Sequence, residues 1–245
     1  MGRVAEWLCR GLQILVRRFD SGPGLHLLES TIMSTHLSHF GRQAAPPQFL
    51  VIFLHGYGAN GANLLSLSWA LEEALPSAVF VAPNAFTPLS SYGKESYQWF
   101  ELENMSPEYL ENSCMRAVEK GVTLIRSLQT TYDVPGERTI LVGFSQGTMM
   151  ALALALSEPS LCRSVIGCAG GLYMDKAAIK ALPETLKIYL IHGNEDTVVP
   201  FLEAEKTLAT LKSLGFNVNL FPIPALGHSI DDQVVENMKK ILRDL

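Results

Sequence analysis

Short apolar runs alternate with longer helical periods along the chain from residue 48 onward, and this alternation limits the folds available to it. A strand that is apolar at nearly every position must be buried on both faces, which is typical of a parallel sheet covered by helices. The pattern therefore predicts the α/β class, with a mostly parallel central sheet and helices on both faces. The predicted strands are Phe49–Leu54, Ala78–Ala82, Thr139–Gly143, Ser164–Ala169, Ile188–His192 and Asn217–Phe221, and the predicted helices are Ala62–Leu75, Pro107–Tyr132, Gln146–Leu156, Pro200–Leu214 and Asp231–Leu242.

No internal repeat or linker interrupts this series, so residues 45–245 are expected to form one α/β domain. Residues 1–44 are expected to be an N-terminal extension that this domain does not need. Apolar side chains recur in the extension at helical spacing among arginines, at Val4, Leu8, Leu12, Leu15 and Phe19. A membrane-surface helix and an organellar targeting peptide therefore remain alternatives to a dispensable segment that precedes a start at Met33.

Composition excludes several classes of protein. With 245 residues, 48% of them hydrophobic, the chain can bury a full core and is not a disordered tail. Its 19 basic and 24 acidic residues leave a formal charge of −5 and no basic block, so nucleic acid is not an expected partner. No stretch reaches the roughly 18 apolar residues of a membrane span, so stable membrane insertion is not expected. The cysteines show neither a CxxC pair nor the spacing of a secreted disulfide framework, which favours free thiols and a cytoplasmic location: Cys9, Cys114, Cys162 and Cys168.

A serine flanked by glycines follows the third predicted strand, in the sequence Gly143-Phe144-Ser145-Gln146-Gly147. This Gly-x-Ser-x-Gly pattern, between a strand and a helix, is typical of a nucleophile on a turn so tight that only small neighbours fit. The predicted helix from Gln146 would direct its free N–H groups toward negative charge that develops beside Ser145. Ser145 is therefore the predicted nucleophile.

A serine hydroxyl needs a base to accept its proton, and a third group must hold that base in one tautomer. In this class of fold the order along the chain is serine, acid, histidine. His228 lies in a loop after the last predicted strand and is the predicted base. His192 precedes the nearby acids, so its order is wrong and a structural role is expected for it.

Two adjacent carboxylates, Glu195 and Asp196, follow the strand that ends at His192. Only one of them can face the imidazole of His228. A short aspartate suits a turn in which its oxygen also accepts hydrogen bonds from nearby backbone N–H groups. Asp196 is therefore the predicted acid, and Glu195 remains the alternative.

The glycine-rich turn after the first predicted strand allows two interpretations. Gly56-x-Gly58-x-x-Gly61 matches a dinucleotide-binding fingerprint, but the next predicted strand ends in Val81-Ala82-Pro83-Asn84, without the acidic residue that would bind a ribose. The turn is instead expected to offer the backbone N–H of Tyr57 as an oxyanion donor beside that of Gln146. His55 is expected to hold the turn in shape.

The irregular stretch from Asn84 to Met105 is too long for a plain crossover, and long loops in compact domains are often functional. It contains Trp99 and Phe100, which are candidates to line an acyl-binding surface and could equally be core residues under the loop. His36 and His39 have no cysteine or carboxylate nearby, so no metal site is predicted there.

Taken together, these motifs resemble those of the acyl-protein thioesterase and phospholipase/carboxylesterase family of α/β-hydrolases, especially its compact bacterial-type carboxylesterases. The resemblance covers about residues 48 to 243. It implies Ser145 as the nucleophile, Asp196 as the acid, His228 as the base, and Tyr57 and Gln146 as oxyanion donors. The motifs that carry it are Leu54-His55-Gly56-Tyr57-Gly58, Gln98-Trp99-Phe100-Glu101, Gly143-Phe144-Ser145-Gln146-Gly147, His192-Gly193-x-x-Asp196-x-x-Val199-Pro200 and Gly227-His228.

Residues and resemblance together predict a serine hydrolase that cleaves carboxylic esters, and acyl thioesters as a second substrate class, through an acyl-enzyme intermediate. The expected partner is a small-molecule or lipid-like acyl ester, and neither a metal nor an organic cofactor is expected. Two alternatives remain. One is a hydrolase-fold protein that binds a small acyl or aromatic ligand without turnover, and the other is a nicotinamide-dependent oxidoreductase.

Overall fold

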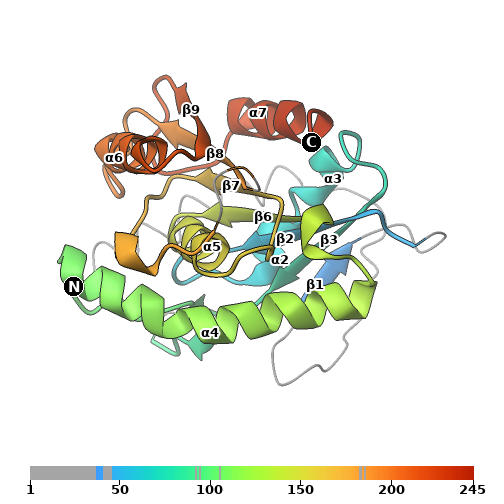
Figure 1. Cartoon of the computed structure of the whole chain (residues 1–245), viewed down its shortest axis with the longest axis horizontal. Coiled ribbons are helices and arrows are strands. Elements are labelled where there is room, and N and C mark those ends of the chain that lie inside the picture. Colours follow the sequence, from blue (N-terminus) through green and yellow to red (C-terminus); the bar gives the residue numbers. More distant parts are fainter. Residues whose placement is uncertain are drawn as a thin grey trace.

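A seven-stranded sheet forms the centre of the protein (Figure 1), whose computed structural model describes residues 37–40, 46–91, 93, 95–104, 106–181, 184 and 186–245. The strand order is β1-β3-β2-β6-β7-β8-β9. β1 runs antiparallel to β3, and every other neighbouring pair in this sheet is parallel. The strands are β1 (Leu37–Phe40), β2 (Phe49–Leu54), β3 (Ala78–Pro83), β6 (Thr139–Phe144), β7 (Ser164–Cys168), β8 (Lys187–Gly193) and β9 (Asn217–Ile223), and a separate antiparallel pair is formed by β4 (Thr87–Pro88) and β5 (Tyr97–Gln98).

Helices cover both faces of the sheet, with the long α4 on one side and α7 on the other (Figure 1). One face packs against α4 (Pro107–Tyr132), α5 (Gln146–Ser157) and α6 (Phe201–Ser213). The opposite face packs against α2 (Gly61–Leu65), α3 (Ser68–Leu71) and α7 (Asp232–Arg243). Two short 3-10 helices span Gly136–Arg138 and Lys176–Ala178. The predicted α/β class, with helices on both faces of a mostly parallel sheet, is thus confirmed.

Burial explains why the central strands are apolar along their whole length. Every residue of β3, β6 and β7 is buried, because helices lie on both sides of them. In the edge strand β9, buried residues alternate with exposed or half-buried ones, and several residues are exposed. All residues of α5 are buried as well, which accounts for its run of alanine, leucine and methionine.

The predicted strands are all present, with ends that differ by at most two residues, and the helix predicted at Pro107–Tyr132 has those bounds. The helix predicted at Ala62–Leu75 was wrong, because two short helices, α2 and α3, occupy this stretch. The Ser66 hydroxyl donates to the Asn63 carbonyl at 2.9 Å, and the Ser68 hydroxyl donates to the Leu65 carbonyl at 2.6 Å. Such side-chain bonds to the backbone compete with regular helix and favour a break.

The edge strand β1 was not predicted. It is only four residues long, and its position depends on pairing with β3, from Leu37 opposite Pro83 to Phe40 opposite Phe80. The sheet therefore begins upstream of residue 45, where the sequence suggested that the domain starts. The interpretations offered for residues 1–32 lie outside the described residues.

Three of the four cysteines lie in the described part of the chain. Cys114, Cys162 and Cys168 are free, as predicted, and all three are buried, whereas Cys9 lies outside the described residues. Among the helices that the structure describes, none is both long and apolar enough to cross a membrane.

Candidate active site

Ser145 lies on the tight turn between β6 and α5, at the carboxyl edge of the sheet. Its backbone has φ 54° and ψ −117°, a conformation that a residue with a side chain rarely adopts. The Ser145 N–H donates to the Cys168 carbonyl at 2.9 Å and so ties the turn to β7. A Cβ atom on Gly147 would overlap the Leu54 carbonyl, and one on Gly143 would lie 2.5 Å from the carbonyl oxygen of Gly147. The two glycines therefore permit the close packing of this turn.

His228 reaches Ser145 from the loop between β9 and α7. Its Nε2 lies 3.0 Å from Oγ of Ser145, although the two residues are 83 positions apart in the sequence. The imidazole packs beside the Phe144 ring, with 5.0 Å between the ring centroids. Both Ser145 and His228 are buried, so neighbouring residues fix the positions of the hydroxyl and the ring.

Asp196 lies on the other side of the same imidazole. Its Oδ2 is 2.7 Å from Nδ1 of His228, and its Oδ1 accepts hydrogen bonds from the N–H groups of Val198 and Val199, each at 2.9 Å. Burial of Asp196 opposes its ionisation, but the hydrogen bonds from His192, His228 and Val198 outweigh that effect and hold its pKa below the ordinary value. The carboxylate is therefore charged at neutral pH.

Glu195 does not reach the imidazole. Its side chain is exposed, while its backbone N–H donates to the Leu226 carbonyl at 3.0 Å. In the same loop, Asn194 Oδ1 accepts a bond from the Ala225 N–H at 2.9 Å. These bonds join the loop after β8 to the loop after β9, so the aspartate and the histidine are held together by backbone as well as by their side chains.

His192, at the end of β8, has a contact that sequence reasoning missed. Its Nε2 lies 2.9 Å from the Val199 carbonyl and 3.2 Å from Oδ2 of Asp196. The sequence led us to expect a structural role for His192, and this contact with the proposed acid is compatible with such a role. The spacing of four residues between the histidine and the aspartate, with a glycine between them, was the available signal in the sequence.

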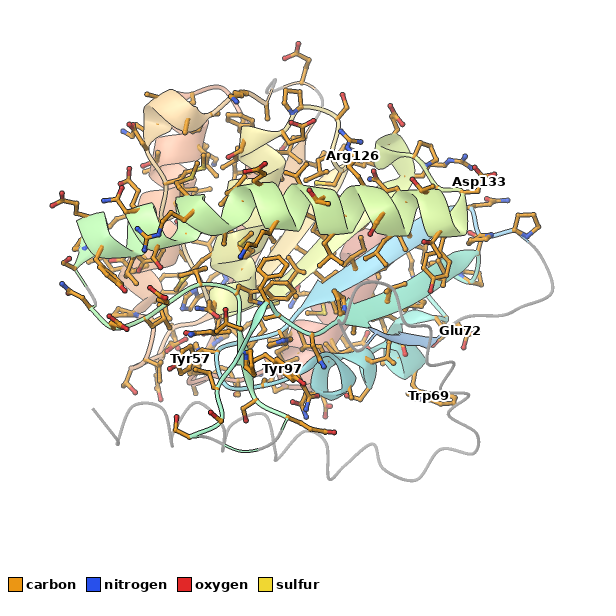
Figure 2. The ribbon with its side chains drawn as sticks, turned by 90° about the horizontal axis from the view of Figure 1, so that it is seen from below. Tyr57, Trp69, Glu72, Tyr97, Arg126 and Asp133 are labelled. Atoms are coloured by element: carbon orange, nitrogen blue, oxygen red, sulfur yellow. The ribbon has the colours of Figure 1, made fainter. Side chains whose placement is uncertain are left out.

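The turn after β2, which carries Tyr57, passes directly beside Ser145. An added Cβ on Gly56 would lie 3.4 Å from the Ser145 Cβ. Two backbone bonds hold the turn: the Gly58 N–H donates to Tyr97 at 2.9 Å, and the Tyr97 N–H donates to Ala59 at 3.0 Å. Figure 2 shows Tyr57 and Tyr97 as neighbours below the long helix α4. The turn with Tyr57 and the first turn of α5 at Gln146 therefore both lie next to Ser145, and the oxyanion role of their N–H groups stays a prediction.

Trp99 and Phe100 are buried in the core rather than open to solvent. The Gln146 side chain binds the backbone of both, because its Oε1 accepts from the Trp99 N–H at 3.0 Å and its Nε2 donates to the Phe100 carbonyl at 2.7 Å. The indole N–H of Trp99 donates to the His55 carbonyl at 2.8 Å. Of the two roles open from the sequence, this placement agrees with that of core residues.

His55 is completely buried and makes a hydrogen bond through each ring nitrogen. Its Nδ1–H donates to the Gly56 carbonyl at 2.7 Å, and its Nε2 accepts from the Ala85 N–H at 3.0 Å. Burial lowers the pKa of His55 from 6.5 to about 4, although the bond to Gly56 acts in the opposite direction. The neutral ring thus connects the turn to the start of the next loop, which is the shape-holding role predicted for it.

The turn with three glycines differs from a phosphate-binding loop. The Asn84 side chain accepts a bond from the Gly61 N–H at 2.8 Å, and the Asn60 side chain accepts one from Asn63 at 3.2 Å. The backbone N–H groups of Gly61 and Asn63 belong to the first turn of α2, and a dinucleotide phosphate would need such N–H groups to be free. In addition, a Cβ on Gly61 would overlap the Ala82 carbonyl, so close helix–strand packing accounts for that glycine.

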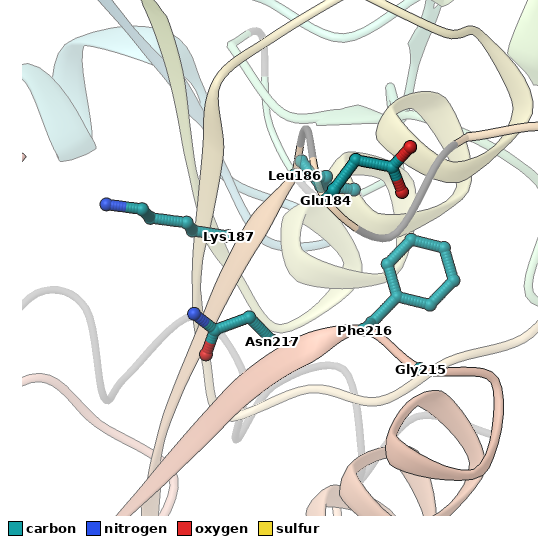
Figure 3. A pocket seen from close by; sticks show the side chains of 6 residues that line it. All are labelled: Glu184, Leu186, Lys187, Gly215, Phe216 and Asn217. Carbon is teal, nitrogen blue, oxygen red and sulfur yellow. The ribbon is translucent and has the colours of Figure 1, made fainter.

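Two cavities lie at different places relative to Ser145. One, of about 140 Å³, lies between α4 and the segment with Trp99 and Phe100, and Arg116 and Lys120 also line it. The other, of about 400 Å³, lies at the amino ends of β8 and β9, beside Lys187 and Phe216 (Figure 3). Since Ser145 is at the opposite edge of the sheet, the larger cavity is remote from it.

Comparisons with known proteins identify the family of the chain. The family model described as phospholipase/carboxylesterase matches residues 40–245. The esterase YpfH of Escherichia coli is 29% identical over 195 residues, covering 78% of this chain and 80% of its own length. Acyl-protein thioesterase 1 of Gibberella zeae is 26% identical over 220 residues, covering 79% and 88%. The crystal structure of esterase PE8 superposes with a TM-score of 0.77 at 30% identity, covering 84% of this chain and 96% of that one. The chain therefore belongs to the phospholipase/carboxylesterase family of α/β-hydrolases and is an enzyme of the esterase class.

Proposed function

We propose that the chain cleaves carboxylic esters, and acyl thioesters as a second class, through an acyl-enzyme intermediate on Ser145. One observation carries the proposal: a continuous line of contacts runs from Oγ of Ser145 to Nε2 of His228 at 3.0 Å and from Nδ1 of His228 to Oδ2 of Asp196 at 2.7 Å. A hydroxyl, an imidazole and an ionised carboxylate in this order activate a serine nucleophile.

In the first half of the reaction, Oγ of Ser145 attacks the carbonyl carbon of the substrate while its proton moves to Nε2 of His228. The negative charge that develops on the carbonyl oxygen is stabilised by the N–H groups of Tyr57 and Gln146. Asp196 accepts the Nδ1–H bond and stabilises the imidazolium. The tetrahedral intermediate then collapses, and His228 returns the proton to the departing alcohol or thiol.

In the second half, a water molecule attacks the acyl-enzyme. His228 takes a proton from that water, the second tetrahedral intermediate forms, and its collapse returns the proton to Oγ of Ser145 and releases the acid. The enzyme ends in its starting state, and each step uses side chains and backbone N–H groups of this chain together with water and substrate.

The family and the relatives support the proposed substrate class. Esterase YpfH and acyl-protein thioesterase 1 are named for ester and thioester cleavage, respectively. Because the same attack and the same oxyanion stabilisation serve both bonds, we extend both classes to this chain, with a small-molecule or lipid-like acyl ester as partner. We also propose residues 45–245, together with β1, as the catalytic domain in a cytoplasmic protein.

A fluorophosphonate probe tests the proposal, because such probes form a covalent bond with an activated serine. We expect one adduct on the full-length protein, located at Ser145 by peptide mass spectrometry, and none on Ser145→Ala. The variant should lose about 10⁴-fold or more in ester turnover while its circular dichroism stays unchanged. Turnover that persists in purified Ser145→Ala, or a protein that binds acyl ligands without any turnover, would contradict the proposal.

A further inference from the structure

His192 is a buried histidine beside the proposed acid, and the steps proposed above do not use it. It lies at the end of β8, and its side chain is 1% exposed. Its ring meets the Phe201 ring edge-on, at a centroid distance of 5.8 Å and an angle of 85°. With the ring packed in this way, Nε2 is directed toward the loop that carries Asp196.

The Nε2 atom of His192 lies between two oxygen atoms. The Val199 carbonyl is 2.9 Å away, and Oδ2 of Asp196 is 3.2 Å away. A carbonyl oxygen and an ionised carboxylate oxygen can only accept hydrogen bonds. The Nε2 atom must therefore carry a proton, which His192 shares between the two oxygens as a donor.

Four donors surround the Asp196 carboxylate. Oδ1 accepts the N–H groups of Val198 and Val199, and Oδ2 accepts Nδ1–H of His228 and Nε2–H of His192. Rotation of the carboxylate would break several of these bonds at once. Without His192, Oδ1 would keep its two backbone donors, but Oδ2 would keep only His228 of these four donors, the ring that Oδ2 itself has to orient.

We propose that His192 is a positioning residue of the reaction, which holds Oδ2 of Asp196 in line with Nδ1 of His228 and thereby keeps Nε2 of His228 directed at Ser145. The bond from His192 also disperses charge on Oδ2, so that the Nδ1 proton stays on His228. This inference rests on the proposed function, because it assigns His192 a role through Asp196.

Three variants test the role: His192→Leu removes the donor, His192→Gln places an amide N–H near the Nε2 position, and His192→Asn is shorter by one methylene. In His192→Leu we expect kcat to fall by about 10- to 100-fold with little change in KM, because the reacting groups are misaligned while substrate binding is kept. The acid limb of kcat/KM should move to higher pH, since an Oδ2 with one donor fewer stabilises the imidazolium more strongly. Among the described residues, the titratable side chains in contact at Oδ2 of Asp196 are His192 and His228, and the side chain of the adjacent Glu195 is exposed.

His192→Gln should restore both kcat and the pH profile, whereas His192→Asn should resemble the leucine variant. If His192→Leu fails to fold, comparison of His192→Gln with His192→Asn still tests the role. Both replacements are polar, but only the glutamine is long enough to reach Oδ2 of Asp196. The inference would be overturned if His192→Leu kept the kcat and the acid limb of the wild type. It would also be overturned if His192→Gln and His192→Asn had the same kcat and the same pH profile.

A double variant separates this inference from the proposed function. If His192 acts through Asp196, then His192→Leu combined with Asp196→Asn should be no slower than Asp196→Asn alone. Full additivity of the two losses would overturn the inference. If Ser145→Ala retains turnover, the proposed function fails, whereas an inactive Ser145→Ala together with an unimpaired His192→Leu contradicts the role of His192 alone.

Discussion

The indole N–H of Trp99 donates a hydrogen bond of 2.8 Å to the backbone carbonyl of His55, and this bond joins two segments that are 44 residues apart in the sequence. His55 begins the turn whose next peptides carry Gly56 and Tyr57. The rings of Trp99 and His55 also lie in contact, with 5.3 Å between their centroids. The buried tryptophan thus supports the backbone that is proposed to bind the oxyanion.

Replacing Trp99 by phenylalanine should remove this bond and keep most of the apolar volume. A buried carbonyl that loses its donor costs about 1 to 3 kcal/mol, so we expect a lower free energy of unfolding. We also expect kcat to fall by about 10-fold, since the Tyr57 N–H loses alignment with the oxyanion. Trp69→Phe, on α3, is the matched control and should leave kcat unchanged.

Steady-state kinetics on esters of increasing acyl length distinguish this support from a direct substrate contact. A substrate contact for Trp99 would raise KM for the longer esters and leave kcat unchanged. That result would favour the acyl-binding role that the sequence left open.

The adjacent acids Glu195 and Asp196 should differ sharply in their mutational effects. Asp196→Asn should lower kcat by about 10³- to 10⁴-fold, because the imidazolium loses its charged partner and the imidazole can adopt the other tautomer. Glu195→Gln should have little effect, since its side chain is exposed. Ester turnover of the two purified variants under one condition provides the comparison, and the reverse ranking would assign the acid to Glu195.

Protonation of His55 should couple stability to pH. Its pKa is about 6.5 in an unfolded chain and about 4 in the fold, where a proton on Nε2 would face the Ala85 N–H. Between these values the unfolded state binds a proton that the folded state does not. The free energy of unfolding should therefore fall as the pH falls from about 6.5 to about 4, by up to about 3 kcal/mol.

Urea denaturation of the wild type and of His55→Gln over this pH range measures the effect. The glutamine can accept a hydrogen bond from the Ala85 N–H but does not titrate. The free energy of unfolding of His55→Gln should therefore fall less between pH 6.5 and pH 4 than that of the wild type. Parallel curves for the two proteins would show that His55 does not carry this proton linkage.

Deletion of residues 1–32, so that the chain starts at Met33, should leave kcat/KM for a short-chain ester within about threefold. The proposed catalytic groups all lie at or beyond Tyr57, and the strand β1 begins only at Leu37. Deletion of residues 1–44 is the matched comparison. It removes β1 and leaves the backbone of β3 without its partner at that edge, so it should lower stability and favour association of chains.

Ester turnover and co-sedimentation with anionic vesicles should be measured on both truncated proteins. If the apolar stripe of the first 32 residues binds membranes, vesicle binding is lost in the shorter deletion while turnover is kept. A large loss of turnover in that deletion would show that the segment packs on the domain.

Local patterns in the sequence were enough to predict most of the fold. Apolar runs predicted each parallel strand, because a strand between two helix layers is buried on both faces. Ser106 as the N-cap, Pro107 at the first position and the left-handed Asp133 at the end agree with the predicted bounds of the longest helix. The break between α2 and α3 was missed, since it depends on serine hydroxyls that turn back on the backbone.

The sequence by itself determined the tight turn at Ser145, because the glycines on either side are needed by local packing, and it determined the order of the serine, the acid and the histidine along the chain. The tertiary structure decided which neighbours face one another. It places Asp196 rather than Glu195 against His228, buries Trp99 beneath the Tyr57 turn, and sets His192 on the Asp196 carboxylate. Local turn chemistry already favoured Asp196 over Glu195, but the contacts of His228 and Trp99 join segments that are 32 and 44 residues apart. Their distances depend on how the parallel strands and their loops align in space, which no local pattern encodes.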